Sequence, residues 1–468
     1  MTVTGPLLTA SGVTVQRGTR VVLKDIDLAI ERGEIVTLTG QNGSGKTTLL
    51  ETIAGLHSLK KGRVKATYTN GNDIIIRDLK GRRTPAPGVS LALQSVGACL
   101  DESVIERLRT ASSVAGIKID DEALETEMEK WSVLHRANDR LAILSNGLRK
   151  RVSVLSALLP AMFSNHQRLI LLDEPGDGMD DESKNILKSS IMMMKDSGHS
   201  IVIVTHDTSM VELSDRTVAL SNGKITTSIQ KSRKPSHVPL LDSYDDNSGI
   251  KEFCRWIVAI ERRNPVDTIQ RLVPALLALF LIRSVGLEDI TNQNTYSLAF
   301  YLLIPALVSV MARPALIDRL SEERSGDWWR AHLGRSVRPY ATILGGPWLL
   351  PLPLVYLSFA VISFNATQID QSAQYWLWLP ALALIDIGIA ATAIQMLVSG
   401  LERSGAVAVS LMMIILIWPF MMTLEATALL LEEGFQYNLG FDTPLGLIIL
   451  SSLISAGVWL SAVVIPDQ

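Results

Sequence analysis

The second half of the chain is too apolar to fold in water alone. From residue 264 to Gln468 no lysine occurs, and long runs of Leu, Ile, Ala and Val follow one another. A helix of about 20 apolar residues is long enough to cross the hydrocarbon core of a bilayer. The whole chain is 47% hydrophobic, which is high for a soluble protein. We therefore predict a soluble first half and a membrane-embedded second half.

The apolar runs predict about six transmembrane helices after a soluble domain. The predicted domains are a soluble domain at 1–230, a linker at 231–252 and a transmembrane domain at 253–468, with spans at 265–286, 296–312, 340–363, 376–399, 405–424 and 444–465. Residues 253–260 are amphipathic and are expected to lie along the membrane surface.

Arginines are distributed unevenly between the predicted loops. The loops at 313–339 and 400–404 contain arginines, whereas those at 287–295, 364–375 and 425–443 contain neither lysine nor arginine. Arginine-rich loops stay on the cytoplasmic side of a membrane. The N-terminus also lacks the basic and apolar segments of a cleaved signal. We expect a multi-pass protein of the cell membrane, with the soluble domain and both termini in the cytoplasm.

The soluble half contains a phosphate-binding loop in its required context. Residues 35–39 form an apolar strand, glycine-rich residues follow, and 48–56 have the leucine spacing of a helix. Glycines let backbone N–H groups turn toward phosphate oxygens, and a helix N-terminus favours negative charge. The residues predicted to bind the phosphates are Gly40, Asn42, Gly43, Ser44, Gly45, Lys46, Thr47 and Thr48. Thr47 is also expected to be a magnesium ligand.

Two further apolar strands end in residues that suit phosphate chemistry. Residues 168–172 lead into Asp173 and Glu174, and residues 201–205 lead into His206. We expect Asp173 to bind magnesium, Glu174 to activate the attacking water, and His206 to sense the γ-phosphate. A core strand would simply continue apolar, so packing alone does not explain these residues.

With these motifs, residues 7–229 resemble the ABC ATPase family. Gln94 resembles the glutamine that links the magnesium site to the membrane domain, and the segment around Ser145 and Gly147 resembles the signature that caps the γ-phosphate of the opposite subunit. Asp180 resembles the loop that crosses the dimer interface. The resemblance implies an α/β P-loop domain with a helical subdomain, ATP and Mg²⁺ as cofactors, catalytic roles for Gln94, Glu174 and His206, and a homodimer formed through the ATPase domains.

This sequence departs from the family pattern at two places. Asn146 and Leu148 replace a glycine and a glutamine of the signature. Arg17 occupies the place where the family tends to have an aromatic residue that stacks on adenine. A guanidinium can also stack on a purine ring. We expect Arg17 to contact the base, with ATP as the nucleotide and loose discrimination between adenine and guanine.

The membrane half carries a more local resemblance. The charged stretch around Glu323, Arg324 and Gly326 resembles the membrane domains of ABC-2 type exporters and suits a coupling helix that docks near Gln94. Trp328 and Trp329 are expected to anchor this loop at the membrane interface. Residues 399–428 resemble the membrane subunit of the cytochrome c maturation haem exporter, which implies haem handling together with further membrane subunits. The spans and outer loops contain no histidine to ligate haem iron.

Three functions remain open at this point. The chain could be an exporter in haem handling, an ABC-2 type exporter of another lipophilic cargo, or a membrane-bound ATPase that does mechanical work on a partner complex.

The net charge of −3 and the absence of a basic stripe argue against nucleic acid as a partner. The two cysteines, Cys99 and Cys254, are expected to be free thiols. Within the spans, Asp386 is expected to face a cavity or another helix, and Glu425 to lie at the outer boundary.

Overall fold

The computed structural model describes residues 5–68, 71–230, 247–284, 295–345, 349–363, 371–399, 414–435 and 437–464. The chain forms two compact units. The first contains residues 1–256 together with 319–337, and the second contains 257–318 together with 338–468. The segment 319–337 therefore belongs with the soluble domain, although the sequence predicts it as a loop between two spans.

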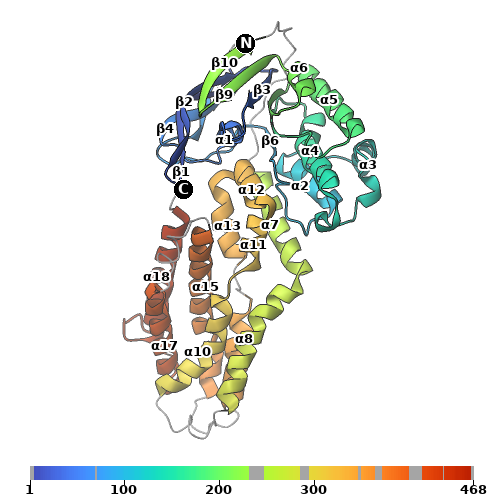
Figure 1. The fold of residues 1–468 in the computed structure, drawn as a ribbon. Helices are drawn as coiled ribbons and strands as arrows, with labels where there is room; N and C mark the ends of the chain where they lie inside the picture. Colours follow the sequence, from blue (N-terminus) through green and yellow to red (C-terminus); the bar gives the residue numbers. More distant parts are fainter. Residues whose placement is uncertain are drawn as a thin grey trace. The chain divides into compact units, whose positions relative to one another are not determined.

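A six-stranded sheet forms the centre of the first unit, with strand order β10-β9-β3-β8-β7-β6 (Figure 1). β3 pairs in parallel with β8 and β9, and β7 pairs in parallel with β6 and β8. The strands are β3 (Ile35–Gly40), β6 (Val89–Ala92), β7 (Leu169–Asp173), β8 (Ser200–Val204), β9 (Arg216–Ser221) and β10 (Lys224–Gln230). The carboxyl ends of β3, β7 and β8 consequently meet at one edge of the sheet.

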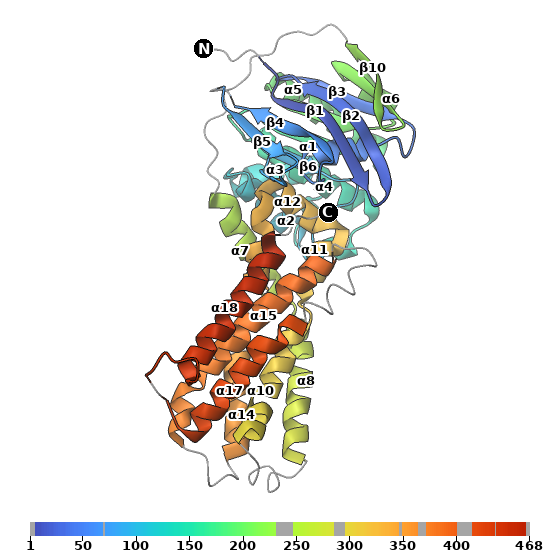
Figure 2. The ribbon, with the colours of Figure 1, turned by 90° about the vertical axis from the view of Figure 1, so that its left-hand side faces the viewer.

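A second, antiparallel sheet has the strand order β2-β1-β4-β5 (Figure 2). Its strands are β1 (Leu8–Arg17), β2 (Arg20–Ile30), β4 (Lys61–Thr67) and β5 (Asp73–Arg77). β1 and β2 form a hairpin in which Arg17 pairs with Arg20 at the turn. This turn brings both arginines to the pocket described below.

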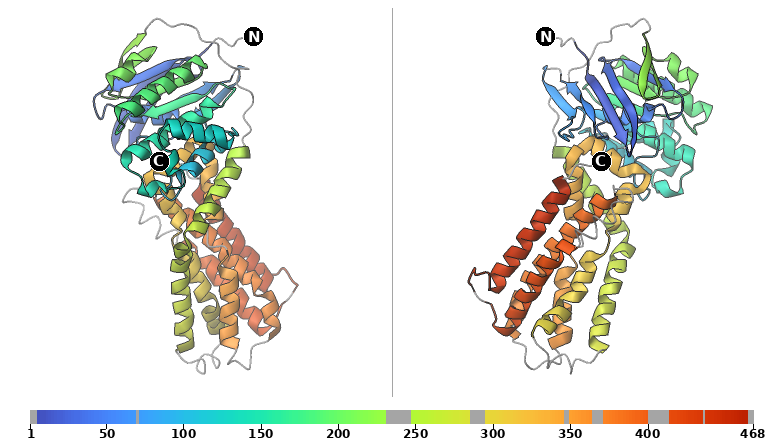
Figure 3. Two further views of the ribbon diagram at one scale, coloured as in Figure 1. Left: turned by 90° about the vertical axis from the view of Figure 1, so that its right-hand side faces the viewer. Right: turned by 60° about the vertical axis from the view of Figure 1, so that its left-hand side comes forward.

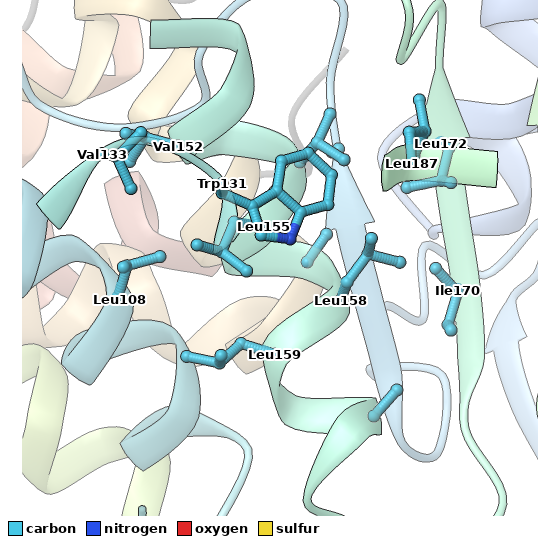
Figure 4. Close-up of a cluster of buried hydrophobic side chains, with 14 of the residues drawn as sticks. Leu108, Trp131, Val133, Val152, Leu155, Leu158, Leu159, Ile170, Leu172 and Leu187 are labelled. Atoms are coloured by element: carbon cyan, nitrogen blue, oxygen red, sulfur yellow. The ribbon is translucent and has the colours of Figure 1, made fainter. Parts of the chain in front are cut away.

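Further helices complete the first unit, and those between β6 and β7 form its helical part, the helical subdomain. The helices are α1 (Lys46–Ile53), α2 (Val104–Val114), α3 (Asp121–Lys130), α4 (Asn146–Met162), α5 (Asp181–Asp196) and α6 (Thr208–Glu212). Trp131 lies fully buried among leucines of α2 and α4 such as Leu108, Leu155 and Leu158, and the same core continues to Ile170 and Leu172 of β7 (Figure 4). One apolar core thus joins the helical subdomain to the central sheet.

Aromatic side chains bury the segment 319–337 against the soluble domain. This segment contains α12 (Ser325–Leu333), and it follows the short helix α11 (Ala315–Ser321). Trp328 and Trp329 are 2% and 0% exposed, and the guanidinium carbon of Arg107 lies 3.9 Å from the centre of the Trp328 ring. The prediction that both tryptophans anchor the loop in a membrane interface was wrong. Their rings are buried against protein, where aromatic packing and a buried cation replace contact with lipid.

Helix α7 (Asn247–Arg263) begins earlier than the predicted surface helix, and it includes residues 247–252 of the predicted linker. Its apolar positions Phe253, Trp256, Ile257 and Ile260 follow helical spacing and are buried. Phe253 and Trp256 contact Trp329 with ring centroids 4.7 and 5.3 Å apart. Residues 231–246, the rest of the predicted linker, lie outside the described residues.

The second unit is all-helical, as predicted for the membrane half. Its remaining helices are α8 (Pro265–Ser284), α10 (Thr295–Met311), α13 (Val337–Leu344), α14 (Pro351–Ser363), α15 (Trp378–Ser399), α17 (Ile417–Glu432) and α18 (Pro444–Val464). α10 packs against α8, α14, α15 and α17, and α18 packs against α15 and α17 (Figure 3). The fold class is therefore an α/β domain followed by a helical bundle.

Three helical segments among the described residues have the length and apolar composition to cross a membrane: Thr295–Leu344, Ala373–Val398 and Pro444–Val464. The six predicted spans remain a prediction. The one at 340–363 falls on two helices, because α13 ends at Leu344 and α14 begins at Pro351, a residue suited to a helix start.

The predicted span 405–424 also differs in extent. Residues 400–413 lie outside the described residues, and α17 continues to Glu432 because Leu424, Ala428 and Leu431 keep an apolar face buried. Glu425 consequently lies within a helix, with its side chain exposed in the single chain. The prediction that Glu425 lies at the outer boundary of the membrane stays a prediction.

Candidate functional site

The loop between β3 and α1 has the backbone shape that phosphate binding requires. Gly40 has a φ of +142°, and a Cβ there would lie 2.2 Å from the carbonyl oxygen of Leu220. Gly45, in the left-handed region, is the N-cap of α1. Lys46 Nζ donates hydrogen bonds to the carbonyl oxygens of Gly40 (2.8 Å) and Gln41 (3.1 Å). The loop thus folds around a lysine ammonium at a helix N-terminus.

Asp173 lies at the end of β7, close to the first turn of α1. The hydroxyl of Thr47 donates to Asp173 Oδ1 over 3.2 Å, whereas Oδ2 is buried and has no hydrogen-bond partner among the described residues. Burial raises the pKa of Asp173 to about 6, although the bond from Thr47 opposes this shift. A buried carboxylate oxygen without a partner is costly unless a cation or a donor binds there.

Glu174 and His206 follow the ends of β7 and β8. Glu174 has a φ of +44°, a left-handed conformation that is strained for this residue type. Its N–H donates to the carbonyl oxygen of Val204 over 2.9 Å, which holds the turn against β8. His206 Nε2 lies 3.4 Å from Glu174 Oε1. The strained turn aims the Glu174 carboxylate out of the sheet edge toward the phosphate loop.

These elements enclose one pocket of about 430 Å³. The phosphate loop, the ends of β6, β7 and β8 and the β1–β2 turn contribute its lining: Arg17, Arg20, Val22, Asn42, Gly43, Gly45, Lys46, Thr47, Thr48, Gln94, Glu174 and His206. Ten of these twelve residues are predicted from the sequence. Three predicted residues do not line the pocket but adjoin residues that do. Gly40 accepts a hydrogen bond from Lys46, and Asp173 accepts one from Thr47. Ser44 lies between Gly43 and Gly45 in the phosphate loop.

The residues predicted to hold magnesium fit a magnesium ion bound together with phosphate. Thr47 and Gln94 line the pocket, and the free Oδ2 of Asp173 supplies a hard oxygen ligand. No group of three or more His, Cys, Asp or Glu side chains in the described part of the chain could hold a metal by itself. Mg²⁺ is usually bound by one or two carboxylates, with substrate phosphates completing its shell.

Arg17 lines the pocket, and its guanidinium also binds two residues that do not line it. One guanidinium nitrogen lies 2.8 Å from Glu51 Oε2 and 2.8 Å from His57 Nε2. The prediction of Arg17 as a base-contacting residue did not include these partners. Glu51 is a charged residue on a helix directly after the phosphate loop, and its pairing with Arg17 depends on the β1–β2 hairpin folding over α1.

Ser145, Gly147 and Asp180 do not line the pocket. Ser145 caps α4 by accepting a hydrogen bond from the N–H of Leu148. A Cβ at Gly147 would lie 2.9 Å from the carbonyl oxygen of Gly178, so the start of α4 packs tightly on the loop before α5. Asp180 caps α5 and binds Arg151 over 2.8 Å. These three residues gather at a second place in the fold.

Sequence reasoning missed Lys150, which links several parts of the site. Lys150 is buried on α4, and its Nζ donates to the carbonyl oxygens of Leu93 (3.2 Å), Gln94 (3.3 Å) and Asp173 (2.9 Å). Burial lowers the pKa of Lys150 to about 8. It therefore ties the signature helix to the ends of β6 and β7. The sequence places Lys150 in the signature-like segment but does not show that its side chain is buried behind Asp173.

Part of this chain is similar to known proteins. A family model described as ABC transporter matches residues 23–177. The lipoprotein-releasing system ATP-binding protein LolD of Bacteroides thetaiotaomicron is 32% identical over 223 residues, which cover 47% of this chain and 99% of that protein.

Two further relatives are also similar to part of the chain. The macrolide export ATP-binding/permease protein MacB of a Shewanella species is 30% identical over 275 residues, 58% of this chain and 41% of that protein. The putative hemin import ATP-binding protein HrtA of Staphylococcus saprophyticus is 31% identical over 211 residues, 44% of this chain and 90% of that protein.

The raised pKa of Asp173 predicts a pH dependence of magnesium-assisted nucleotide binding. Only the ionised carboxylate binds Mg²⁺, so the affinity of the full chain for MgATP should fall as the pH drops through about 6, by up to about tenfold per pH unit below it. Titration with ATP at pH 5 to 8, with and without Mg²⁺, measures the effect. Asp173→Asn should bind weakly at every pH, and a wild-type profile that is flat across pH 6 would contradict the prediction.

Proposed function

The chain belongs to the ABC transporter family, and we propose that it is an ATP-hydrolysing half-transporter that works as a homodimer in the cell membrane. The observation that carries this proposal is the pocket in which Lys46 and Thr47 face Glu174 and His206, with the carboxylate of Asp173 directly behind Thr47. This arrangement brings phosphate-binding, metal-binding and proton-accepting groups together at one sheet edge.

Each group has a distinct chemical task in this proposal. Lys46, now held by two backbone carbonyls, would donate to the β- and γ-phosphates. Glu174 would accept a proton from the attacking water, and His206, 3.4 Å from its Oε1, would orient that carboxylate toward the γ-phosphate. Bound Mg²⁺, held by Thr47, Asp173 and Gln94, would supply charge neutralisation at the phosphates.

The proposed homodimer follows from where the signature residues lie. Ser145 is exposed at the N-terminus of α4 and does not line the pocket of its own chain. A helix N-terminus with free backbone N–H groups favours an anion such as a γ-phosphate. Two chains arranged head to tail would bring Ser145 and Gly147 of one copy to the ATP held by Lys46 of the other. Dimerisation would thus complete each site.

The cargo is proposed from weaker observations. Residues 399–428 resemble a haem exporter, although residues 400–413 of that stretch lie outside the described residues. HrtA is named for hemin import, whereas LolD and MacB are named for lipoprotein release and macrolide export. Haem handling for cytochrome c maturation, with further membrane subunits, is our first proposal. Export of another lipophilic cargo is the second candidate, because two relatives carry names of that kind. Mechanical work on a partner complex is the third.

His332 does not serve as a haem ligand in this proposal. It is buried in the first unit, and burial lowers the pKa of His332 to about 4. Its Nδ1 lies 2.8 Å from the carbonyl oxygen of Trp328, and its ring centroid lies 4.1 Å from that of Trp328, with the ring planes tilted by 34°. The chain would therefore power a handover of haem between other groups rather than ligate the iron through this histidine.

Glu174→Gln should stop hydrolysis while retaining ATP. The amide keeps the shape of the side chain but cannot accept the proton, so the turnover of the full chain should fall by about 100-fold or more. Phosphate release and ATP binding, measured on the same detergent-solubilised preparation, test both halves of this statement. Asp177→Asn, on the same loop but outside the pocket lining, is the matched control. Unchanged turnover in Glu174→Gln would exclude Glu174 as the base.

Complementation between two inactive variants tests the homodimer. Lys46→Ala and Ser145→Arg should each abolish hydrolysis alone. A mixed dimer contains one intact site, so an equal co-expression mixture should recover about a quarter of wild-type turnover if the chains pair at random. A mixture of Lys46→Ala with Glu174→Gln is the control, since both residues belong to the same half of a site, so each site of the mixed dimer carries one defect and no turnover should be recovered. An inactive first mixture, or equal recovery in both mixtures, would contradict a shared site.

The cargo candidates differ in what stimulates hydrolysis. In liposomes that contain only this chain, haem or another lipophilic solute should raise turnover if the chain is an exporter. Haem retained on purification from native membrane, together with stimulation by haem over other solutes, favours the haem proposal. Stimulation by a co-purified membrane protein alone, with no response to any solute, favours mechanical work and counts against both export candidates.

A further inference from the structure

Glu51 is a buried carboxylate that the phosphate-binding role of its helix does not use. It lies on α1, five residues after Lys46, and its side chain is 0% exposed. Its Oε2 lies 2.8 Å from a guanidinium nitrogen of Arg17 and 2.6 Å from His57 Nε2. Its Oε1 binds Arg324. Three basic side chains from three separate segments therefore share one carboxylate.

The partner on one side, Arg17, belongs to the nucleotide pocket. Its side chain is 51% exposed, and it lines the pocket beside Arg20 and Val22. A carboxylate binds the edge of a guanidinium, whereas a purine stacks on the flat face. Glu51 can therefore hold the edge of Arg17 while the face remains open to a base. Held in this way, Arg17 loses little freedom when a nucleotide binds.

The partner on the other side, Arg324, belongs to the segment 319–337. Arg324 has a φ of +60° and precedes α12, and its guanidinium also binds Asp327 over 2.6 Å. The same segment is fixed close to Gln94, because the N–H of Gly97 donates to the carbonyl oxygen of Glu323 over 2.9 Å. The ion pair between Arg324 and Glu51 is a second contact of this segment with the first unit, and it is made on α1, the helix that follows the phosphate loop.

The two attachments of Glu51 are mechanically linked. The two carboxylate oxygens of Glu51 are held rigidly in one plane. If Arg17 moves and Oε2 moves with it, the carboxylate rotates and Oε1, which binds Arg324, moves as well. Burial alone would raise the pKa of Glu51, but hydrogen bonds from His57 and Arg324 lower it below its usual value. The group is thus a carboxylate in a site where water does not compete, and loss of one cation changes how it holds the other.

We propose that Glu51 is a shared counter-ion that couples the base-contacting residue Arg17 to Arg324 of the segment 319–337. The inference rests on the nucleotide binding proposed above and extends it to the nucleotide base. A base stacked on Arg17 favours the carboxylate orientation that holds Arg324, and a seated Arg324 in turn favours binding of the base. Such coupling is reciprocal by thermodynamic necessity. Glu51 acts here as a positioning residue.

A double-mutant cycle on the full chain tests this coupling with Arg17→Ala, Arg324→Ala and the double variant. The ligands are MgADP, which carries a base and is not hydrolysed, and magnesium pyrophosphate, which has no base. Arg324 does not line the pocket, yet Arg324→Ala should weaken MgADP binding by about fivefold. The same variant should leave pyrophosphate binding unchanged. In the Arg17→Ala background, Arg324→Ala should have no further effect on MgADP.

Arg335→Ala is the matched control, because Arg335 lies in the same segment but donates to the carbonyl oxygen of Gly81. Its effect on MgADP should be the same with and without Arg17. Pyrophosphate binding shows that each variant is folded, and Arg324→Lys, which keeps a cation, should restore part of the MgADP affinity.

Additive effects of Arg17→Ala and Arg324→Ala, or equal losses for MgADP and pyrophosphate, would overturn the coupling alone. A wild-type chain that binds neither ligand would overturn the proposed function and this inference together.

Discussion

Parallel pairing of β3, β8 and β7 is the constraint on which the rest of the first unit depends. The register places Leu38 beside Val204, and Val204 beside Asp173. Each strand therefore ends at the same edge, where the chain turns into a loop that carries a functional side chain. Because the strands are buried on both faces, polar groups can emerge only at this edge, and that is where the pocket lies.

Buried charge near that edge connects parts of the unit that are distant in sequence. Lys150 of α4 binds the backbone behind Gln94 and Asp173, and Glu51 of α1 binds Arg17 and Arg324. Isolated buried charges are costly, so each must keep its partners in place. Lys150 and Glu51 therefore connect the helical subdomain and residues 319–337 to the sheet edge at which the nucleotide pocket lies.

The segment 319–337 packs against the first unit, although it is separated from the rest of that unit in sequence by residues of the second unit. Trp328, Trp329 and Phe253 bury their rings together, and Arg107 lies against Trp328. Aromatic rings of this size remove a large apolar area from water and prefer tilted packing. The segment is consequently part of the first unit, whereas the chain on either side of it, residues 257–318 and 338–468, belongs to the second.

The sequence alone determined the local chemistry of this protein. The phosphate loop, the two carboxylates after β7 and the histidine after β8 could be identified because each is a short motif with its own strand or helix. The helical nature of the membrane half followed from composition for the same reason. Tertiary structure decided what depends on distant segments meeting: Arg17 bound to Glu51, Lys150 behind Asp173, and two tryptophans buried in protein rather than placed at lipid. Local spacing carries no information about such pairs, because they form only when hairpin, sheet and loop fold onto one another.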